Sequence, residues 1–109
     1  MNFFNKLVVI FIASVVASSA LYAADGESIY MQTCVACHGE DGTGALPGTP
    51  DFTDAEGRLS QNDAVLIKNM REGVQGVGSP MAMPAKGGNS NLNDDDLKNV
   101  LVYMRTRFL

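Results

Sequence analysis

Both cysteines and the one histidine of this 109-residue chain lie within five consecutive positions, Cys34-Val35-Ala36-Cys37-His38. On a helix, residues three or four apart share a face, so both thiols and the imidazole would point to one side. The pattern Cys-x-x-Cys-His is typical of c-type haem attachment. In that chemistry two thiols add across the two vinyl groups of one porphyrin, and the following histidine binds the iron.

Other interpretations of the motif fit the rest of the sequence less well. A thioredoxin-like redox pair would need a βαβ context, which the chain lacks. A structural zinc site would need a fourth ligand, and there is neither a second Cys-x-x-Cys nor a second histidine. A chance occurrence of so short a motif is the remaining alternative. We therefore predict one covalently attached haem c per chain, which would also staple a domain too small to bury a thick core.

The helix that would carry the motif is predicted from residue 26 to residue 38. Gly26 and Tyr30 precede the two cysteines at the spacing of one helical face, and Gly39 can end the helix. The motif would then lie on the last turns of this helix.

Two further helices are predicted downstream. One runs from 61 to 72, where Ser60 and Asp63 resemble a capping box. The other runs from 94 to 108, with Asn93 as its N-cap. Both carry apolar residues at the spacing of one helical face.

Two loops rich in glycine and proline separate these helices, at residues 39–52 and 73–91. Val77, Met81 and Met83 make the second loop apolar, so we expect it to pack against the rest of the domain. No segment alternates cleanly over the length of a strand. The expected fold class is all-α, with three main helices and long loops wrapped around the haem.

The first 24 residues resemble a secretory signal peptide. Lys6 precedes an apolar run and a stretch of small residues that ends near Ala24. The apolar run at 7–16 is short for a membrane span unless the residues after it are counted, so an uncleaved anchor is the alternative. We expect cleavage and export to the periplasm, with no stable membrane insertion and residues 25–109 left as one domain.

The exported part would be acidic. One of the eight Lys and Arg is Lys6, so seven remain from residue 25 on against all twelve Asp and Glu, a net charge of −5. Such a domain is not expected to bind nucleic acid or anionic lipid. Partners with basic docking patches are expected instead, with association rates that fall as salt rises.

With these features the chain resembles class I cytochrome c, in particular the small bacterial monohaem kind such as cytochrome c5. The resemblance is carried by Gly26 and Tyr30 ahead of the Cys-x-x-Cys-His motif, by Met-Pro-Ala-Lys-Gly-Gly at 83–88, and by the helical sequence at 94–104. It covers nearly all of residues 25–109. The chain departs from cytochrome c5 in one respect, because it has no cysteine pair after the Met-Pro loop.

The resemblance implies a methionine as the second axial ligand of the iron, since a single histidine excludes bis-His ligation within one molecule. Met31, Met70 and Met104 fall in helical patterns and are expected to fill the core. Met81 and Met83 lie in a loop that could reach the far face of the haem. In the family the ligand is followed directly by proline, which selects Met83 and leaves Met81 as the alternative.

The resemblance also implies a proline carbonyl that accepts a hydrogen bond from the second ring nitrogen of the proximal ligand, His38. Pro47 is the first candidate for this carbonyl and Pro50 the second.

Packing around the haem is expected to be apolar. Gly26 and Tyr30 are expected to meet Val100 and Tyr103 where the first and last helices cross. The candidates to line the haem pocket are Leu46, Phe52, Leu59, Leu66, Met70, Val77 and Leu97.

Ligation on both sides leaves no open position at the iron, so the resemblance implies one-electron transfer and no enzymatic activity. We expect a soluble, monomeric periplasmic carrier that shuttles electrons between respiratory redox proteins such as a dehydrogenase and an oxidase. One alternative is an accessory haem c subunit that stays bound to such an enzyme. Another is a ligand sensor or peroxidase with a labile methionine.

Overall fold

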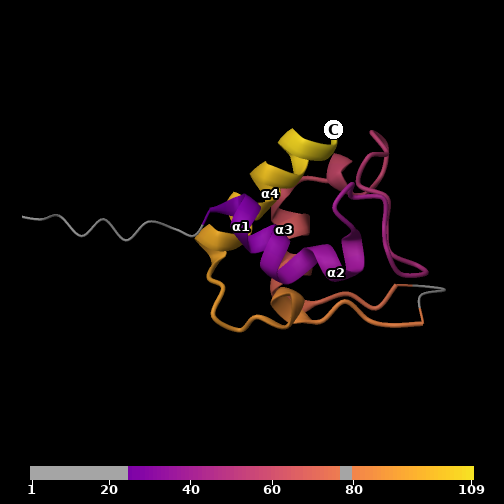
Figure 1. Ribbon diagram of the computed structural model, residues 1–109. Helices are drawn as coiled ribbons and strands as arrows, with labels where there is room; N and C mark the ends of the chain where they lie inside the picture. The colour runs from indigo at the N-terminus through magenta and orange to yellow at the C-terminus, as the bar shows by residue number, and fades with distance from the viewer. Residues whose placement is uncertain (1–24, 77–79) are drawn as a thin grey trace, which may run out of the picture.

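The computed structural model describes residues 25–76 and 80–109 (Figure 1). The predicted leader and Val77 lie outside these residues. The α-helices are α1 (Gly26–Ile29), α2 (Val35–His38), α3 (Asp63–Glu72) and α4 (Asp94–Phe108). A π-helical turn, Tyr30–Cys34, joins α1 to α2, and 3-10 turns lie at Arg58–Ser60 and Ala85–Gly88. No β-strand occurs within the described ranges, which confirms the all-α class.

The predicted helix 26–38 is present, and it consists of three consecutive segments: α1, the π-helical turn and α2. Its middle piece is the π-helical turn, which the sequence analysis did not anticipate. A π turn takes in an extra residue and is frequent at functional sites. The helix ends at Gly39, whose φ of 83° favours glycine.

The second helix, α3, begins later than predicted. Its N-cap is Asn62, whose Oδ1 accepts a hydrogen bond from the Val65 amide at 3.0 Å. Ser60 instead belongs to a 3-10 turn and donates its hydroxyl to the Gly57 carbonyl. The predicted capping box of Ser60 and Asp63 is therefore wrong, because a second good capping residue two positions later takes its place.

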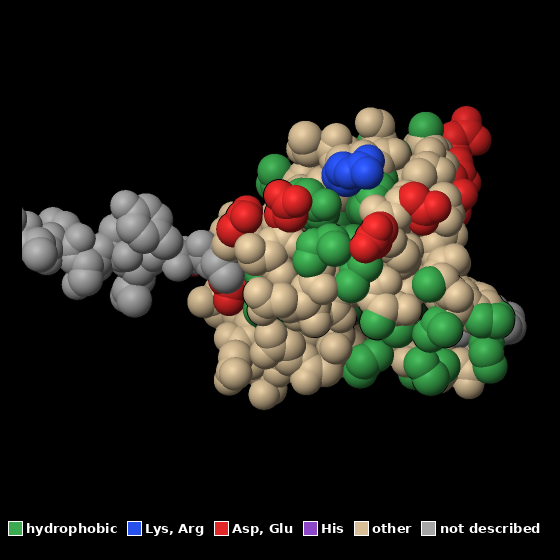
Figure 2. Space-filling view, viewed as in Figure 1, with side chains coloured by type: hydrophobic (Ala, Val, Ile, Leu, Met, Phe, Trp, Pro, Cys, Tyr) green, Lys and Arg blue, Asp and Glu red, His purple; other side chains and the backbone are tan. Residues whose placement is uncertain are grey.

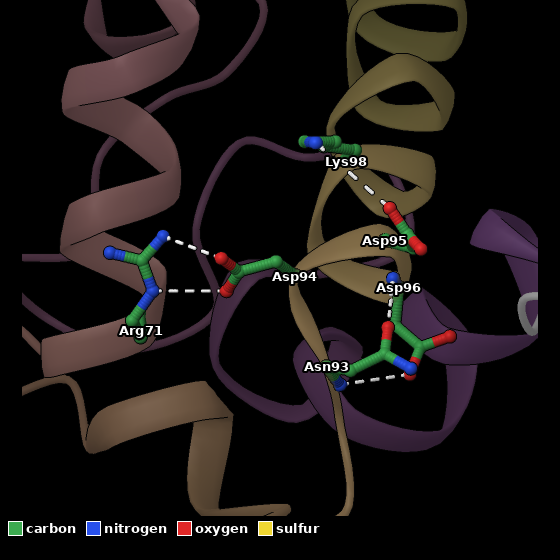
Figure 3. Close-up of polar contacts among 6 residues, drawn as sticks. All are labelled: Arg71, Asn93, Asp94, Asp95, Asp96 and Lys98. Atoms are coloured by element: carbon green, nitrogen blue, oxygen red, sulfur yellow. Dashed lines mark hydrogen bonds and ion pairs between the residues drawn. The ribbon is translucent and has the colours of Figure 1, made fainter.

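The third helix, α4, has the predicted bounds and the predicted N-cap. Asn93 Oδ1 accepts a hydrogen bond from the Asp96 amide at 2.9 Å, and the Asp96 carboxylate accepts one from the Asn93 amide at 3.0 Å (Figure 3). This reciprocal pair is a capping box, with Asp in the place of the usual Glu.

Helix α4 packs against both α1 and α3 (Figure 1). At the crossing with α1, a Cβ on Gly26 would lie 2.3 Å from the Asn99 carbonyl oxygen and 2.9 Å from Tyr103 Cβ. Tyr30 is fully buried there, with its ring centroid 5.5 Å from that of Tyr103. The prediction that Gly26 marks this crossing is confirmed.

Ion pairs join α3 and α4 near both ends. Arg71 Nε and Nη2 each donate to the Asp94 carboxylate at 2.9 Å (Figure 3). At the other end Arg105 pairs with Asp63, and its guanidinium also donates to the Leu59 carbonyl at 3.2 Å. The two helices therefore run antiparallel, with the last turn of α4 holding the start of α3.

Candidate haem-binding site

The Cys-x-x-Cys-His motif consists of Cys34, the last residue of the π-helical turn, and the whole of α2. Its backbone carbonyls hold the following loop. The Cys37 carbonyl accepts a hydrogen bond from the Ala45 amide at 2.8 Å, and the His38 carbonyl accepts one from the Gly44 amide at 3.0 Å. The motif and the loop after it therefore form one hydrogen-bonded unit.

One pocket brings together the residues that the sequence analysis named for haem attachment, for iron ligation and for the proline carbonyl. The space is about 1210 Å³ when the open solvent at its mouth is included. Its walls include Cys34, Cys37, His38, Pro47, Pro50, Met81 and Met83. These positions come from both sides of α3 in the sequence, and only the fold places them around one space.

The apolar lining was largely as expected. Leu46, Phe52, Leu59, Leu66 and Met70 line the pocket. Leu97 does not line it, because its side chain is buried in the core.

Several lining residues were not predicted. Leu101 and Met104, on the inner face of α4, contribute to the wall, as do Thr33 and Asn69. Leu101 could have been found from the apolar spacing of α4, whereas no sequence signal marks Asn69 as a wall residue.

The prediction that Met31, Met70 and Met104 fill the core holds for two of the three. Met70 and Met104 are buried. Met31 is 42% exposed, because its position in the π-helical turn points it away from the packed face.

The His38 imidazole is buried and unusually placed. Its ring stacks on Phe52, with centroids 4.6 Å apart and ring planes 17° from parallel. Its Nδ1 is buried and has no hydrogen-bond partner among the described residues. A buried polar atom without a partner is rare in native proteins.

The hydrogen bond predicted from His38 to Pro47, or to Pro50, is therefore not formed in this structure. Both prolines nevertheless line the same pocket as the ring. Burial lowers the pKa of His38 below its ordinary value, so the imidazole is neutral at neutral pH. Neutral imidazole is the form that binds metals.

The two thiols are free and partly buried at the pocket wall. Burial, and after it the neighbouring Cys37, raises the pKa of Cys34 to about 11. A buried, protonated thiol is a poor nucleophile for disulfide exchange.

Met83 lines the same pocket as the motif, and its backbone is bonded to Val74, just after the end of α3. Its amide donates to the Val74 carbonyl at 2.7 Å, and its carbonyl accepts from the Val74 amide at 3.0 Å. The Met83 side chain is partly buried and packs against the core. Met81 also lines the pocket but is 58% exposed.

The mouth of the pocket is poor in charge. Among the described lining residues there is no Asp or Glu, and Arg58 is the one Lys or Arg. Leu46 and Met81, both at this pocket, are among the exposed large apolar side chains. Figure 2 shows apolar side chains gathered over the region of the loops after α2 and α3, while the acidic side chains lie elsewhere on this face.

In the part of the chain that the structure describes, none of the helices combines the length and the apolar character needed to cross a bilayer.

A protein-family model described as "Cytochrome C oxidase, cbb3-type, subunit III" matches residues 22–104. The chain is 36% identical over 85 residues to the cbb3-type cytochrome c oxidase subunit FixP of Bradyrhizobium diazoefficiens. That match covers 77% of this chain but 27% of FixP, so the chain spans about a quarter of that relative's length.

Smaller relatives are covered more fully. The chain is 36% identical over 83 residues to cytochrome c-555 of Prosthecochloris aestuarii, a match that covers 74% of this chain and 83% of the relative. Among solved structures, the KustC0563 c-type cytochrome is similar with a TM-score of 0.61 and 30% identity. That similarity covers 79% of this chain and 100% of the other.

The family match covers most of the chain, and the buried imidazole, the two free thiols and the apolar pocket fit a haem. The family carries electrons and is not a family of enzymes. The chain belongs to this cytochrome c family, as a small class I member whose cofactor is one covalently bound haem c.

Proposed function

We propose that the protein is an exported, soluble one-electron carrier whose haem c is held by Cys34 and Cys37 and ligated by His38 and Met83. The observation that carries the proposal is the single pocket in which all four side chains meet. When bound, haem c supplies reversible one-electron chemistry at its iron. The residues of the chain attach it, ligate it and exclude water from it.

The two cysteines act in attachment. Each S–H adds across one vinyl group of the haem, so that the sulfur bonds to carbon and the hydrogen goes to the other vinyl carbon. The protonated thiol of Cys34, at the pocket wall, is available for this addition and is not held in a disulfide.

The axial ligands tune the potential. His38 offers a neutral imidazole and Met83 a neutral thioether, and this pair raises the reduction potential. The apolar walls favour the less charged ferrous form, because burying a charge away from water costs free energy. Pro47 remains the proposed acceptor for His38 Nδ1, an atom that has no hydrogen-bond partner among the described residues.

Two observations favour Met83 over Met81 as the distal ligand. The Met83 side chain is partly buried against the core, and its backbone is fixed by two hydrogen bonds. Met81 is 58% exposed. A side chain that already points into the protein loses less conformational freedom on binding the iron.

Electron exchange with partners is proposed to occur at the pocket mouth. The contact there would be apolar, through side chains such as Leu46 and Met81. The acidic side chains away from the mouth would steer the approach of partners with basic patches and would make association slower at high salt.

The second candidate function is that of an accessory haem c subunit of an oxidase. It is favoured by the similarity to FixP and to the related subunit CcoP of Cereibacter sphaeroides, both named as subunits of cbb3-type oxidases. The chain matches 27% of each of these proteins. Gel filtration of a native extract separates the two functions, since a carrier elutes alone and a subunit elutes with its enzyme.

The proposal is tested by optical spectra of the exported protein, with haem staining after denaturing electrophoresis. We expect haem that survives denaturation, a low-spin spectrum, and the weak long-wavelength ferric band of methionine-sulfur ligation. A high-spin spectrum, or carbon monoxide binding to the ferrous protein at neutral pH, would contradict a carrier and favour a ligand sensor. The mass of the same preparation tests cleavage near residue 24.

A further inference from the structure

We infer that Gly73 and Val74, at the end of α3, are positioning residues that hold Met83 in place for the iron. The inference rests on the proposed ligation by Met83. It adds that the methionine is presented by a backbone framework, so that its bond to iron depends on two residues that are not iron ligands.

The first contact of this framework is the antiparallel bridge between Val74 and Met83. Both residues use their amide and their carbonyl in it, at 2.7 and 3.0 Å. Because both hydrogen bonds are between backbone atoms, the Val74 side chain is not needed for them. The bridge fixes the Met83 backbone relative to the last turn of α3.

The second contact is the close approach of Gly73 to the Met-Pro segment. Gly73 has a φ of 83°, and a Cβ there would lie 2.6 Å from the Met83 carbonyl oxygen and 2.9 Å from the Ala85 amide nitrogen. Both of these atoms belong to the backbone, so no side-chain rotation can relieve the overlap. Any side chain at Gly73 must therefore push the Met83 backbone away from α3.

The third contact holds the far end of the same segment. A Cβ on Gly87 would lie 2.7 Å from Thr33 Cγ2, in the π-helical turn that ends at Cys34. Met83 thus lies between the bridge to Val74 and a close packing contact with the helix that carries the first attachment cysteine, and this contact limits free movement of the whole segment.

Helix α3 is itself fixed close to this point. Arg71, two residues before Gly73, forms the two-bond ion pair with Asp94 at the start of α4 (Figure 3). The end of α3 is therefore joined to the start of α4 close to the bridge.

The test is Gly73→Ala in the haem-loaded protein, with Gly88→Ala as the matched control. Gly88 has a similar φ of 86°, but a Cβ there would meet nothing within 4 Å. Both variants place alanine at a positive φ, which L residues rarely adopt. The Gly73 variant alone overlaps the Met83 backbone.

We expect Gly73→Ala to retain covalent haem but to lower the ratio of methionine-bound to methionine-free ferric protein roughly tenfold relative to Gly88→Ala, the size expected for one strongly strained contact. The long-wavelength ferric band reports this ratio. Carbon monoxide binds only iron that has lost its methionine, so its apparent affinity for the ferrous protein should rise by a similar factor. Helix content by circular dichroism should stay the same in both variants.

Equal effects of the two variants on the band would overturn the inference, since backbone strain alone would then explain them. Val74→Ala supplies a second check, because it retains the backbone bridge and should retain the band. Loss of the band in Val74→Ala would count against a backbone framework.

Met83→Ala and Met81→Ala distinguish this inference from the ligand assignment. If Met83→Ala retains the band and Met81→Ala loses it, the ligand assignment is wrong and the inference falls with it. If Met83→Ala loses the band while Gly73→Ala behaves as Gly88→Ala does, the ligand is right and only the framework is wrong.

Discussion

The hydroxyl of Tyr30 donates a hydrogen bond to the carbonyl of Gly39 at 2.6 Å. Tyr30, the first residue of the π-helical turn, is thus bonded to Gly39, the residue at which the helix of the motif ends. Burial raises the pKa of Tyr30 far above its ordinary value, so the hydroxyl remains a donor. The Tyr30 side chain therefore links the start and the end of the helical stretch that carries both cysteines and His38.

Tyr30→Phe tests this contact. The variant leaves the partly buried Gly39 carbonyl without this donor, and we expect the free energy of unfolding to fall by about 1 kcal/mol. Denaturant unfolding followed by circular dichroism measures it. Tyr103→Phe is the control, because the Tyr103 hydroxyl makes no hydrogen bond with the described residues. Equal losses in the two variants would mean that the Tyr30 bond contributes nothing specific.

Gly26→Ala tests the crossing of α1 and α4. Alanine normally stabilises an exposed helical position relative to glycine. Here the added methyl group would overlap the Asn99 carbonyl, so we expect the opposite sign, a loss of about 1–3 kcal/mol. Thermal unfolding measures it, with Ser28→Ala on the exposed side of α1 as the control. A gain in stability would show that the helices can separate at no cost.

The ion pair between Arg71 and Asp94 predicts a dependence on pH. The hydrogen bonds from Arg71, above all, hold the pKa of Asp94 below its ordinary value. The contribution of the pair is therefore fully present above the ordinary pKa of an aspartate and is lost as the pH falls through the lowered value. Both side chains are about half exposed, so the effect is small and falls with salt.

A double-mutant cycle of Arg71→Gln and Asp94→Asn measures the coupling at neutral and at acidic pH. We expect a favourable coupling energy at neutral pH that disappears at acidic pH. A coupling that is unchanged at acidic pH would contradict the assignment to the ionised carboxylate.

Replacing Cys34 and Cys37 together by alanine tests the attachment. We expect no haem on a stained denaturing gel. We also expect a marked loss of helix content, because the apolar pocket would be left without the haem that fills it. Val35→Ala, at a variable position within the motif and partly buried, is the control and should retain its haem. Native helix content in the variant without cysteines would show that the fold does not depend on the cofactor.

The sequence predicted the parts of the fold that rest on local signals. Gly39 and Asn93 mark helix ends by their own backbone and capping chemistry, so they were found correctly. The start of α3 was missed because Ser60 and Asn62 are both good caps, and the choice between them depends on the 3-10 turn that precedes them. The π-helical turn leaves no signal in residue spacing over so short a stretch.

The sequence predicted which residues form the site, but it did not predict the contacts that hold those residues in place. Cys34, Cys37 and His38 are contiguous, and Met83 is marked by the proline that follows it. The contacts of Gly73 with Met83 and of Gly87 with Thr33 join distant segments, and only the folded chain brings them together. The same holds for Arg105, whose partners lie more than forty residues away in the sequence.

The crossing of α1 with α4 also bears on when the domain can fold during synthesis. A chain made from its N-terminus exposes the segment Cys34–His38 long before α4 exists, and Gly26 has no neighbour until Asn99 arrives. The packing of α1 on α4 joins an early and a late part of the chain, so this crossing can form only after α4 has been made.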